Sequence, residues 1–373
     1  MKNKRIAAGI AIIIIIVIGV WIVAQKRGEQ NPIRIVALFP LTGGLASYGE
    51  SAQNAAQLAV EDINAQGGIN GKKLEVLYQD HQCDPKTALS IFKQFSSTVK
   101  IFTSAACSGT VLSIAPNLEK EQTLLLGTIV TTPKITGVSP YVFRNWSSDA
   151  KEANLLAKHI RKVGYTAVGV LYEETDYAKG LNLSLQESLK DSGVRMIRES
   201  FGSKTIDVRT QLSKLKDQKI DIFFVSPQTT TSAEMILIQM EQIGFKPKLL
   251  INDNVLKAAD LVKKYANILE GAVGGDYVIH QREESLLTLS RYKETFGSEC
   301  AQTNICLGVY DAIHLLAQGV ETNGYSAQGV QKYLQTVKYD GVSGTITFDE
   351  KNDRKDSEYS LFTVHNGMRE IIQ

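Results

Sequence analysis

Short apolar runs alternate along the chain with longer segments in which apolar residues recur at helical spacing. The run "IRIVALFP" at 33–40 is typical of a buried strand, and 52–68 has Ala, Leu and Val on one face before a Gly pair ends the helix. Further segments of these two kinds follow in turn at 73–80, 85–97, 100–106 and 123–130. This order predicts an open, largely parallel sheet with helices on both faces.

The rhythm resumes after "YVFRNWSSD" at 141–149 and predicts a second unit of the same kind. Strands are expected at 166–172, 194–200, 221–226 and 247–253, and helices at about 150–163, 177–191, 207–217 and 232–243. The segment 282–338 is mostly helical and has no strands of its own, so we expect it to return to the first sheet.

We therefore expect an α/β fold of two doubly wound, Rossmann-like lobes joined by hinge strands. About 345 residues beyond the N-terminal segment exceed what one core usually needs, which also favours two lobes. The expected division is 33–147 plus 278–343 for lobe 1, and 148–277 plus 344–373 for lobe 2.

The N-terminal segment 1–28 has the pattern of a membrane signal. An unbroken apolar run from Ile6 to Ala24 follows three basic residues and precedes Lys26 and Arg27. As a helix, this run would be about 28 Å long, close to the thickness of a bilayer's hydrocarbon core. The segment favours an uncleaved signal anchor over a removed signal peptide, and both interpretations place the rest of the chain outside the cytoplasm.

Charge excludes one class of partner. The first 27 residues hold five of the 41 Lys and Arg residues and no acid, which leaves 36 basic against 39 acidic residues. This near balance offers no basic stripe for nucleic acid, and we expect none to bind. No cofactor motif is present: "GGING" at 67–71 follows a helix and is not a dinucleotide fingerprint.

The four cysteines suit disulfides in an oxidising compartment. A Cys83–Cys107 bridge would close a loop of about 25 residues, and Cys300 with Cys306 could close a smaller ring. A catalytic thiol or a metal site are the alternatives, although no C-x-x-C pair or His-rich cluster supports a metal.

Loops that follow the predicted strands are rich in hydroxyls, and ligands of parallel sheets bind at these strand ends. Ser108 in "ACSGT" begins a helix, so its hydroxyl and the first free amides could hold an anion. A simple N-cap serine is the competing interpretation. Thr131 and Thr132 offer the same chemistry, and together the two loops could surround one carboxylate.

The run "LTGGLASYG…VEDINAQGGINGKKLEVLYQDHQCDPKTA…ACSGT" resembles the leucine/isoleucine/valine-binding proteins, type I solute-binding proteins of ABC importers. The resemblance is strongest over 33–135, persists as a pattern to 253, and returns at "SGTITFDE". It implies a Cys83–Cys107 disulfide that fixes the loop carrying Ser108.

The resemblance also implies roles for seven residues. Ser108 and Thr131 would hold the ligand's α-carboxylate, and the carbonyl of Ile129 would take its ammonium. The others would line the cleft: Tyr48, Tyr177, Asp253 facing the ammonium, and Gln228 or a nearby Thr in place of a tyrosine. Asp253 stands where the family has a glutamate, and "VSPQTTTSAEM" departs from its Gly-Gly-Tyr run, so the ligand could be something other than an amino acid.

The function implied is a monomeric, extracytoplasmic binding protein, held at the membrane by the N-terminal helix, that delivers an amino acid to an ABC permease and ATPase. An alternative is a sensor with a similar clamp, or a protein that binds an amide or another small carboxylate. An enzyme is the remaining alternative, with His81 as a candidate base near Ser108, but no hydrolase, metalloprotease or phosphate-binding motif supports it.

Overall fold

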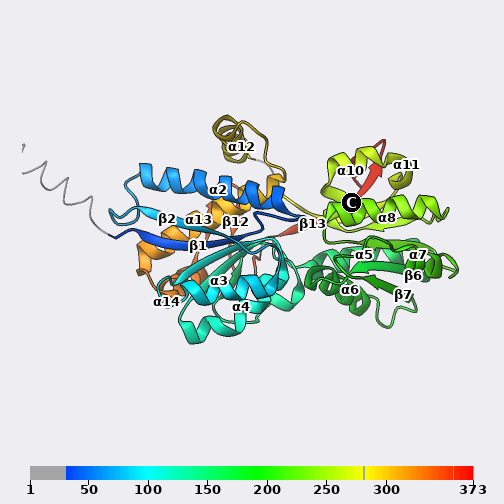
Figure 1. Ribbon diagram of the computed structural model, residues 1–373, viewed down its shortest axis with the longest axis horizontal. Helices are drawn as coiled ribbons and strands as arrows, with labels where there is room; N and C mark the ends of the chain where they lie inside the picture. The colour runs from blue at the N-terminus through cyan, green and yellow to red at the C-terminus, as the bar shows by residue number, and fades with distance from the viewer. Residues whose placement is uncertain (1–30, 280–281, 356, 373) are drawn as a thin grey trace, which may run out of the picture.

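The computed structural model describes residues 31–372 except 280–281 and 356, and it has two α/β lobes side by side (Figure 1). The first lobe is built on a parallel five-stranded sheet in the order β2-β1-β3-β4-β5. Its strands are β1 (Ile33–Phe39), β2 (Leu74–Asp80), β3 (Ile101–Ala105), β4 (Leu124–Thr128) and β5 (Val142–Arg144). The parallel sheet predicted from the first apolar runs is confirmed.

Side chains alternate between the two faces of this sheet, so each face has its own core. Ile35 and Ala37 pack with one group of helices, whereas Val36 and Leu38 pack with the other. The first group is α2 (Ala46–Ala65), α13 (Thr303–Asn323) and α14 (Ala327–Thr336), with α12 (Glu283–Phe296) outside it; the second is α3 (Pro85–Phe95) and α4 (Ser108–Glu121). The late helices therefore return to the first sheet, as their lack of strands predicted.

The second lobe has a seven-stranded sheet in the order β14-β13-β10-β9-β8-β6-β7. Its parallel part comprises β6 (Ala167–Glu173), β7 (Arg195–Phe201), β8 (Ile222–Ser226), β9 (Leu249–Ile251) and β10 (Val273–Val278). Two antiparallel strands, β13 (Glu358–His365) and β14 (Met368–Ile371), complete one edge.

Helices cover both faces of this second sheet (Figure 1). They are α5 (Asp149–Val163), α6 (Asp176–Ser188), α7 (Arg209–Lys216), α8 (Thr230–Gln242), α9 (Asp253–Lys257), α10 (Ala259–Lys264) and α11 (Ala266–Leu269). The short helices α9 to α11 occupy a segment for which the apolar pattern predicted no element.

The division of the C-terminal segment differs from the expected one. The hairpin of β11 (Tyr339–Gly341) and β12 (Gly344–Ile346) lies on the first lobe, where Ile346 and Phe348 are buried in its core. The expected start of the second-lobe segment was residue 344. Apolar packing thus keeps the chain in the first lobe for longer than the strand pattern indicated.

The predicted signal anchor at 1–28 lies outside the described residues. Within the part of the chain that the structure describes, no helix has the length and apolarity that a membrane crossing requires.

Candidate functional site

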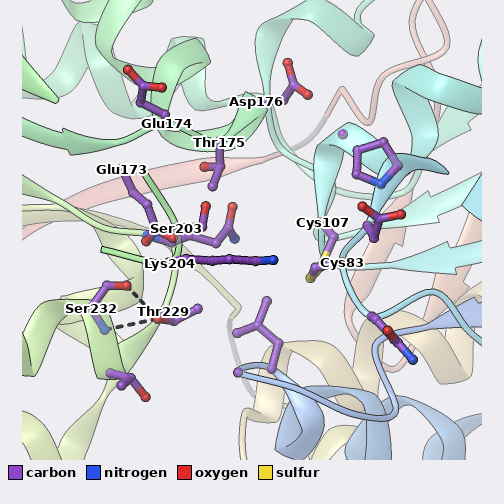
Figure 2. Close-up of a pocket in the computed structure, with 18 of the residues that line it drawn as sticks. Cys83, Cys107, Glu173, Glu174, Thr175, Asp176, Ser203, Lys204, Thr229 and Ser232 are labelled. Atoms are coloured by element: carbon purple, nitrogen blue, oxygen red, sulfur yellow. Dashed lines mark hydrogen bonds between the residues drawn. A yellow bond between two sulfur atoms is a disulfide. The ribbon is translucent and has the colours of Figure 1, made fainter. Parts of the chain in front are cut away.

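A cleft of about 1000 Å³ lies between the lobes, where the carboxyl ends of both sets of strands meet (Figure 2). First-lobe loops contribute Thr42, Leu45, Cys83, Asp84, Cys107 and Ser108, and second-lobe loops contribute Glu173, Glu174, Thr175, Asp176, Lys204, Gln228 and Thr229. Lys204 points into the cleft from the second lobe (Figure 2). The sequence predicted hydroxyls at this place, but the second-lobe wall also carries several carboxylates.

Ser108 is the first residue of α4, and it lines the cleft. The preceding Cys107 has a φ of 53° and provides no side-chain cap for the first amides of α4. The Ser108 hydroxyl accepts a hydrogen bond from the Thr132 amide at 3.2 Å. The two loops that the sequence singled out therefore meet at one place, as a carboxylate site would need.

The turn after β4 carries Ile129 and Thr131, and a buried arginine fixes its shape. Ile129 has a φ of 53°, in the left-handed region that a β-branched residue seldom adopts. Arg144 Nη1 donates to the carbonyl oxygens of Val130, Thr131 and Thr132 at 3.1, 3.0 and 3.1 Å. Three consecutive carbonyls are thus held by one guanidinium group.

Arg144 is itself held by Asp353, which reaches the site from the C-terminal segment. Its Nη2 lies 2.5 Å and its Nε 3.0 Å from the two carboxylate oxygens of Asp353, a bidentate pair with Arg144 fully buried. Sequence reasoning missed this brace. The only signal was an arginine within the apolar run "YVFRNW".

Both disulfides considered from the sequence are present. Cys83 and Cys107 join the loops after β2 and β3 with a Cα–Cα distance of 5.3 Å, and Cys300 and Cys306 are joined at 6.4 Å. His81 lies beside the first bridge, where its Nδ1 accepts from the Cys83 amide at 3.1 Å. Burial lowers the pKa of His81 to about 4, so this histidine is neutral and positions the Cys83 loop.

The lobes touch across the cleft through the same turn that carries Thr131. Thr132 Oγ1 donates to the carbonyl of Asp176 in α6 at 3.0 Å. A Cβ at Gly180 would lie 1.9 Å from Thr132 Oγ1, so only glycine allows this approach. Lys134 and Asp176 add a half-exposed ion pair at 3.6 Å, which contributes little energy.

Tyr177 and Asp253 are buried and do not line the open cleft. The Tyr177 hydroxyl donates to Asp253 Oδ1, and Lys257 Nζ lies 2.7 Å from Asp253 Oδ2. Lys257 also pairs with Asp276 at 3.2 Å, and Arg369 pairs with Asp276 at 2.6 Å. We call Asp253, Lys257, Asp276 and Arg369 the second-lobe ion cluster.

Burial controls protonation around this cluster. Burial and the carboxylate of Asp253 together raise the pKa values of Asp149 and Glu152 well above their ordinary range. Burial alone would lower the pKa of Lys257, but the carboxylates of Asp253 and Asp276 raise it above its usual value. Lys257 is therefore charged, whereas burial favours the neutral acid at Asp149 and Glu152.

The remaining predicted residues flank this region. Tyr48 of α2 accepts from Gln302 Nε2 at 2.7 Å, and burial raises the pKa of Tyr48 to about 12. Gln228 lines the cleft, where its backbone N–H donates to Glu173 Oε2 at 2.8 Å. Of the seven predicted residues, Ser108 and Gln228 line the open cleft, Ile129 and Thr131 lie in the adjoining turn, and Tyr48, Tyr177 and Asp253 lie around Lys257.

Two α/β lobes that meet across a cleft at their strand ends define a bilobal solute-binding protein. The chain belongs to the family of periplasmic binding proteins, whose sequence profile matches residues 32–368. The family resemblance and the type I fold expected from the sequence are thereby confirmed.

Individual relatives agree with this family. A leucine-, isoleucine-, valine-, threonine- and alanine-binding protein of Pseudomonas aeruginosa is 25% identical over 359 residues, which cover 92% of each chain. The structure is similar to that of the isoleucine complex of LivJ from Streptococcus pneumoniae, with a TM-score of 0.76, 24% identity, and coverage of 92% of this chain and 99% of the other. It is also similar to a leucine-binding protein from Thermotoga maritima, with a TM-score of 0.79, 22% identity, and coverage of 91% and 98%.

Proposed function

We propose that this chain is the extracytoplasmic solute-binding protein of an ABC importer, and that it binds a small organic carboxylate between its lobes. The carboxylates to test first are the branched-chain amino acids, because relatives that align with nine-tenths of the chain are named for them. A permease and its ATPase would receive the ligand from the closed form. The protein would act as a monomer held at the extracytoplasmic face of the cell membrane by its N-terminal helix.

One observation carries this proposal: the Ser108 hydroxyl meets the 129–132 turn beside the open cleft. Hydroxyls and free helix amides bind a carboxylate without burying a second full charge. Ser108, Thr131 and the first amides of α4 would grip the ligand's carboxylate from the first lobe. Contact of α6 with the same turn would couple that grip to closure, since a ligand that touches both lobes favours the closed form.

A thermal-shift screen of the full-length chain tests the ligand class. Amino acids, their amides, small carboxylates and polyols would be compared at equal concentration, because a compound that binds only the folded chain raises its melting temperature. We expect stabilisation by carboxylates and not by the matching amides. Stabilisation by polyols alone would contradict the proposal.

The transport role needs a separate test. Cells lacking this chain should lose uptake of the stabilising compound, and uptake should return when the chain is restored. Normal uptake without the chain would contradict a role in import and would favour a sensor.

A further inference from the structure

The carboxylate expected to receive a ligand's ammonium is already paired with an ammonium of this chain. Lys257 Nζ lies 2.7 Å from Asp253 Oδ2, and both side chains are only 7% exposed. The other oxygen of Asp253 accepts from the Tyr177 hydroxyl. Both carboxylate oxygens of Asp253 therefore have partners within the protein.

Local structure explains this pairing. Asn252 caps α9 through a hydrogen bond to the Val255 amide, so the helix begins at Asp253 and ends at Lys257. Residues four apart lie on the same face of a helix, and this spacing brings the lysine back over the aspartate. Lys257 and Tyr48 of the first lobe each shift the pKa of the other, so Lys257 lies near the junction of the two lobes.

The second-lobe ion cluster balances its own charge. Two carboxylates, Asp253 and Asp276, face two cations, Lys257 and Arg369, with Lys257 3.2 Å and Arg369 2.6 Å from Asp276. No negative charge within the cluster is left for an incoming ammonium. A ligand ammonium directed at Asp253 would have to displace Lys257 or lie beside it, which either breaks the Lys257–Asp253 pair or places two buried cations side by side.

We propose that Lys257 determines specificity by standing in the place of a ligand ammonium, so that this protein takes carboxylates that lack an α-amino group. This inference rests on the proposed carboxylate site at Ser108 and narrows the ligand class within it. The first lobe would still bind a carboxylate, while the charges of the second-lobe ion cluster would neutralise one another.

Matched ligand pairs test the inference directly on the full-length wild-type chain. Leucine and 4-methylpentanoate differ only in the ammonium, as do valine and 3-methylbutanoate, and phenylalanine and 3-phenylpropanoate. Calorimetric titration should give at least tenfold tighter binding for the acid without the amine in whichever pair binds. Equal or tighter binding of the amino acid would overturn the inference and leave the proposed function standing.

If neither member of any pair binds, nor any other small carboxylate, the proposed carboxylate site fails, and the inference fails with it. That result differs from a preference for amino acids, so the two failures are distinguishable.

A Lys257→Met variant tests the residue itself. In this variant, the ratio of the affinity for the acid without the amine to the affinity for the matching amino acid should fall at least tenfold. The reason is that Asp253 becomes free to pair with a ligand ammonium. Lys264→Met, which removes an exposed lysine from the same lobe, is the control and should keep the wild-type ratio. An unchanged ratio in a folded Lys257→Met protein would overturn the assignment; if that variant does not fold, the wild-type pairs still decide.

Discussion

The two walls of the cleft differ in how their polar groups are used. On the first lobe, the Ser108 and 129–132 turns present neutral groups beside the cleft, and the buried Arg144 behind them holds backbone carbonyls in place. On the second lobe, charged side chains are paired with one another in the ion cluster. The first-lobe turns are therefore shaped to hold a ligand, whereas the second-lobe ion cluster is satisfied before anything binds.

The difference shows that the partners a polar group already has within the protein, and not its residue type, decide whether it can meet a ligand. Asp253 would be an obvious partner for an ammonium in sequence, yet Lys257 and Tyr177 already occupy it. Ser108, an ordinary N-cap candidate in sequence, is joined to the 129–132 turn and faces the cleft.

The largest expected effect is the loss of stability when the buried Arg144–Asp353 pair of the first lobe is broken. Arg144→Met should lower the free energy of unfolding by about 3–5 kcal/mol, because it leaves the carboxylate of Asp353 buried without its partner. Urea unfolding measures this loss. Arg34→Met, which breaks an exposed pair with Glu75 in the same lobe, is the control and should cost far less. Similar losses of unfolding free energy in both variants would show that the Arg144–Asp353 pair does not stabilise the first lobe.

The next largest effect concerns His81, which is neutral beside the Cys83 loop. The pKa of His81 is about 4 in the folded chain against an ordinary 6.5, so the unfolded chain takes up this proton first as the pH falls. His81 should therefore contribute about 3 kcal/mol of stability above pH 6.5 that is lost between pH 6.5 and 4.

A His81→Gln variant isolates that contribution from other titrating groups. The difference in unfolding free energy between wild type and variant should shrink as the pH falls from 6.5 to 4, and stay constant above 6.5. A difference that does not change with pH would mean that His81 is not buried in its neutral form.

A smaller effect is expected on the second wall. Tyr177→Phe removes the hydroxyl that donates to the buried Asp253, which should cost about 1–3 kcal/mol of stability. Affinity for a bound carboxylate should change less than threefold, because the Tyr177 hydroxyl bonds to Asp253 and does not line the cleft. Tyr172→Phe is the matched control, since its hydroxyl makes no hydrogen bond within the described residues. A tenfold loss of affinity in Tyr177→Phe would show that the Tyr177 hydroxyl takes part in ligand binding, which contradicts the difference drawn between the two lobes.

The smallest effect in energy is the most specific to binding. Ser108→Ala should weaken carboxylate binding by about 1–2 kcal/mol, since one hydrogen bond to a charged group is lost. Calorimetry measures the change. Ser113→Ala is the control on the same helix, because that hydroxyl donates to the Thr110 carbonyl and does not line the cleft. Equal affinities in both variants would remove Ser108 from the site.

The sequence predicted the parts of the molecule that depend on local pattern. Strands such as β1 and β4 show as apolar runs, and the turn at Ser108 follows from a strand that ends at a helix start. The Cys83–Cys107 bridge could also be predicted, from the family resemblance, because cysteines are few in this chain and easily recognised as candidate partners.

The parts that sequence reasoning missed depend on contacts between distant segments. Arg144 pairs with Asp353, 209 residues away, and it lies in a strand of only three residues that leaves no periodic signal. Lys257 is four residues from Asp253, but the pairing needs a five-residue helix that no apolar periodicity marks. Its other partner, Asp276, comes from a different strand.

The central claim is that the first wall grips a carboxylate, and one pair of titrations tests it most directly. The tightest-binding acid from the screen and its primary amide, which has the same shape without the charge, would be titrated into the full-length chain. We predict at least tenfold tighter binding of the acid, and a smaller gap in Ser108→Ala. Equal binding of acid and amide by the wild-type chain would contradict the account.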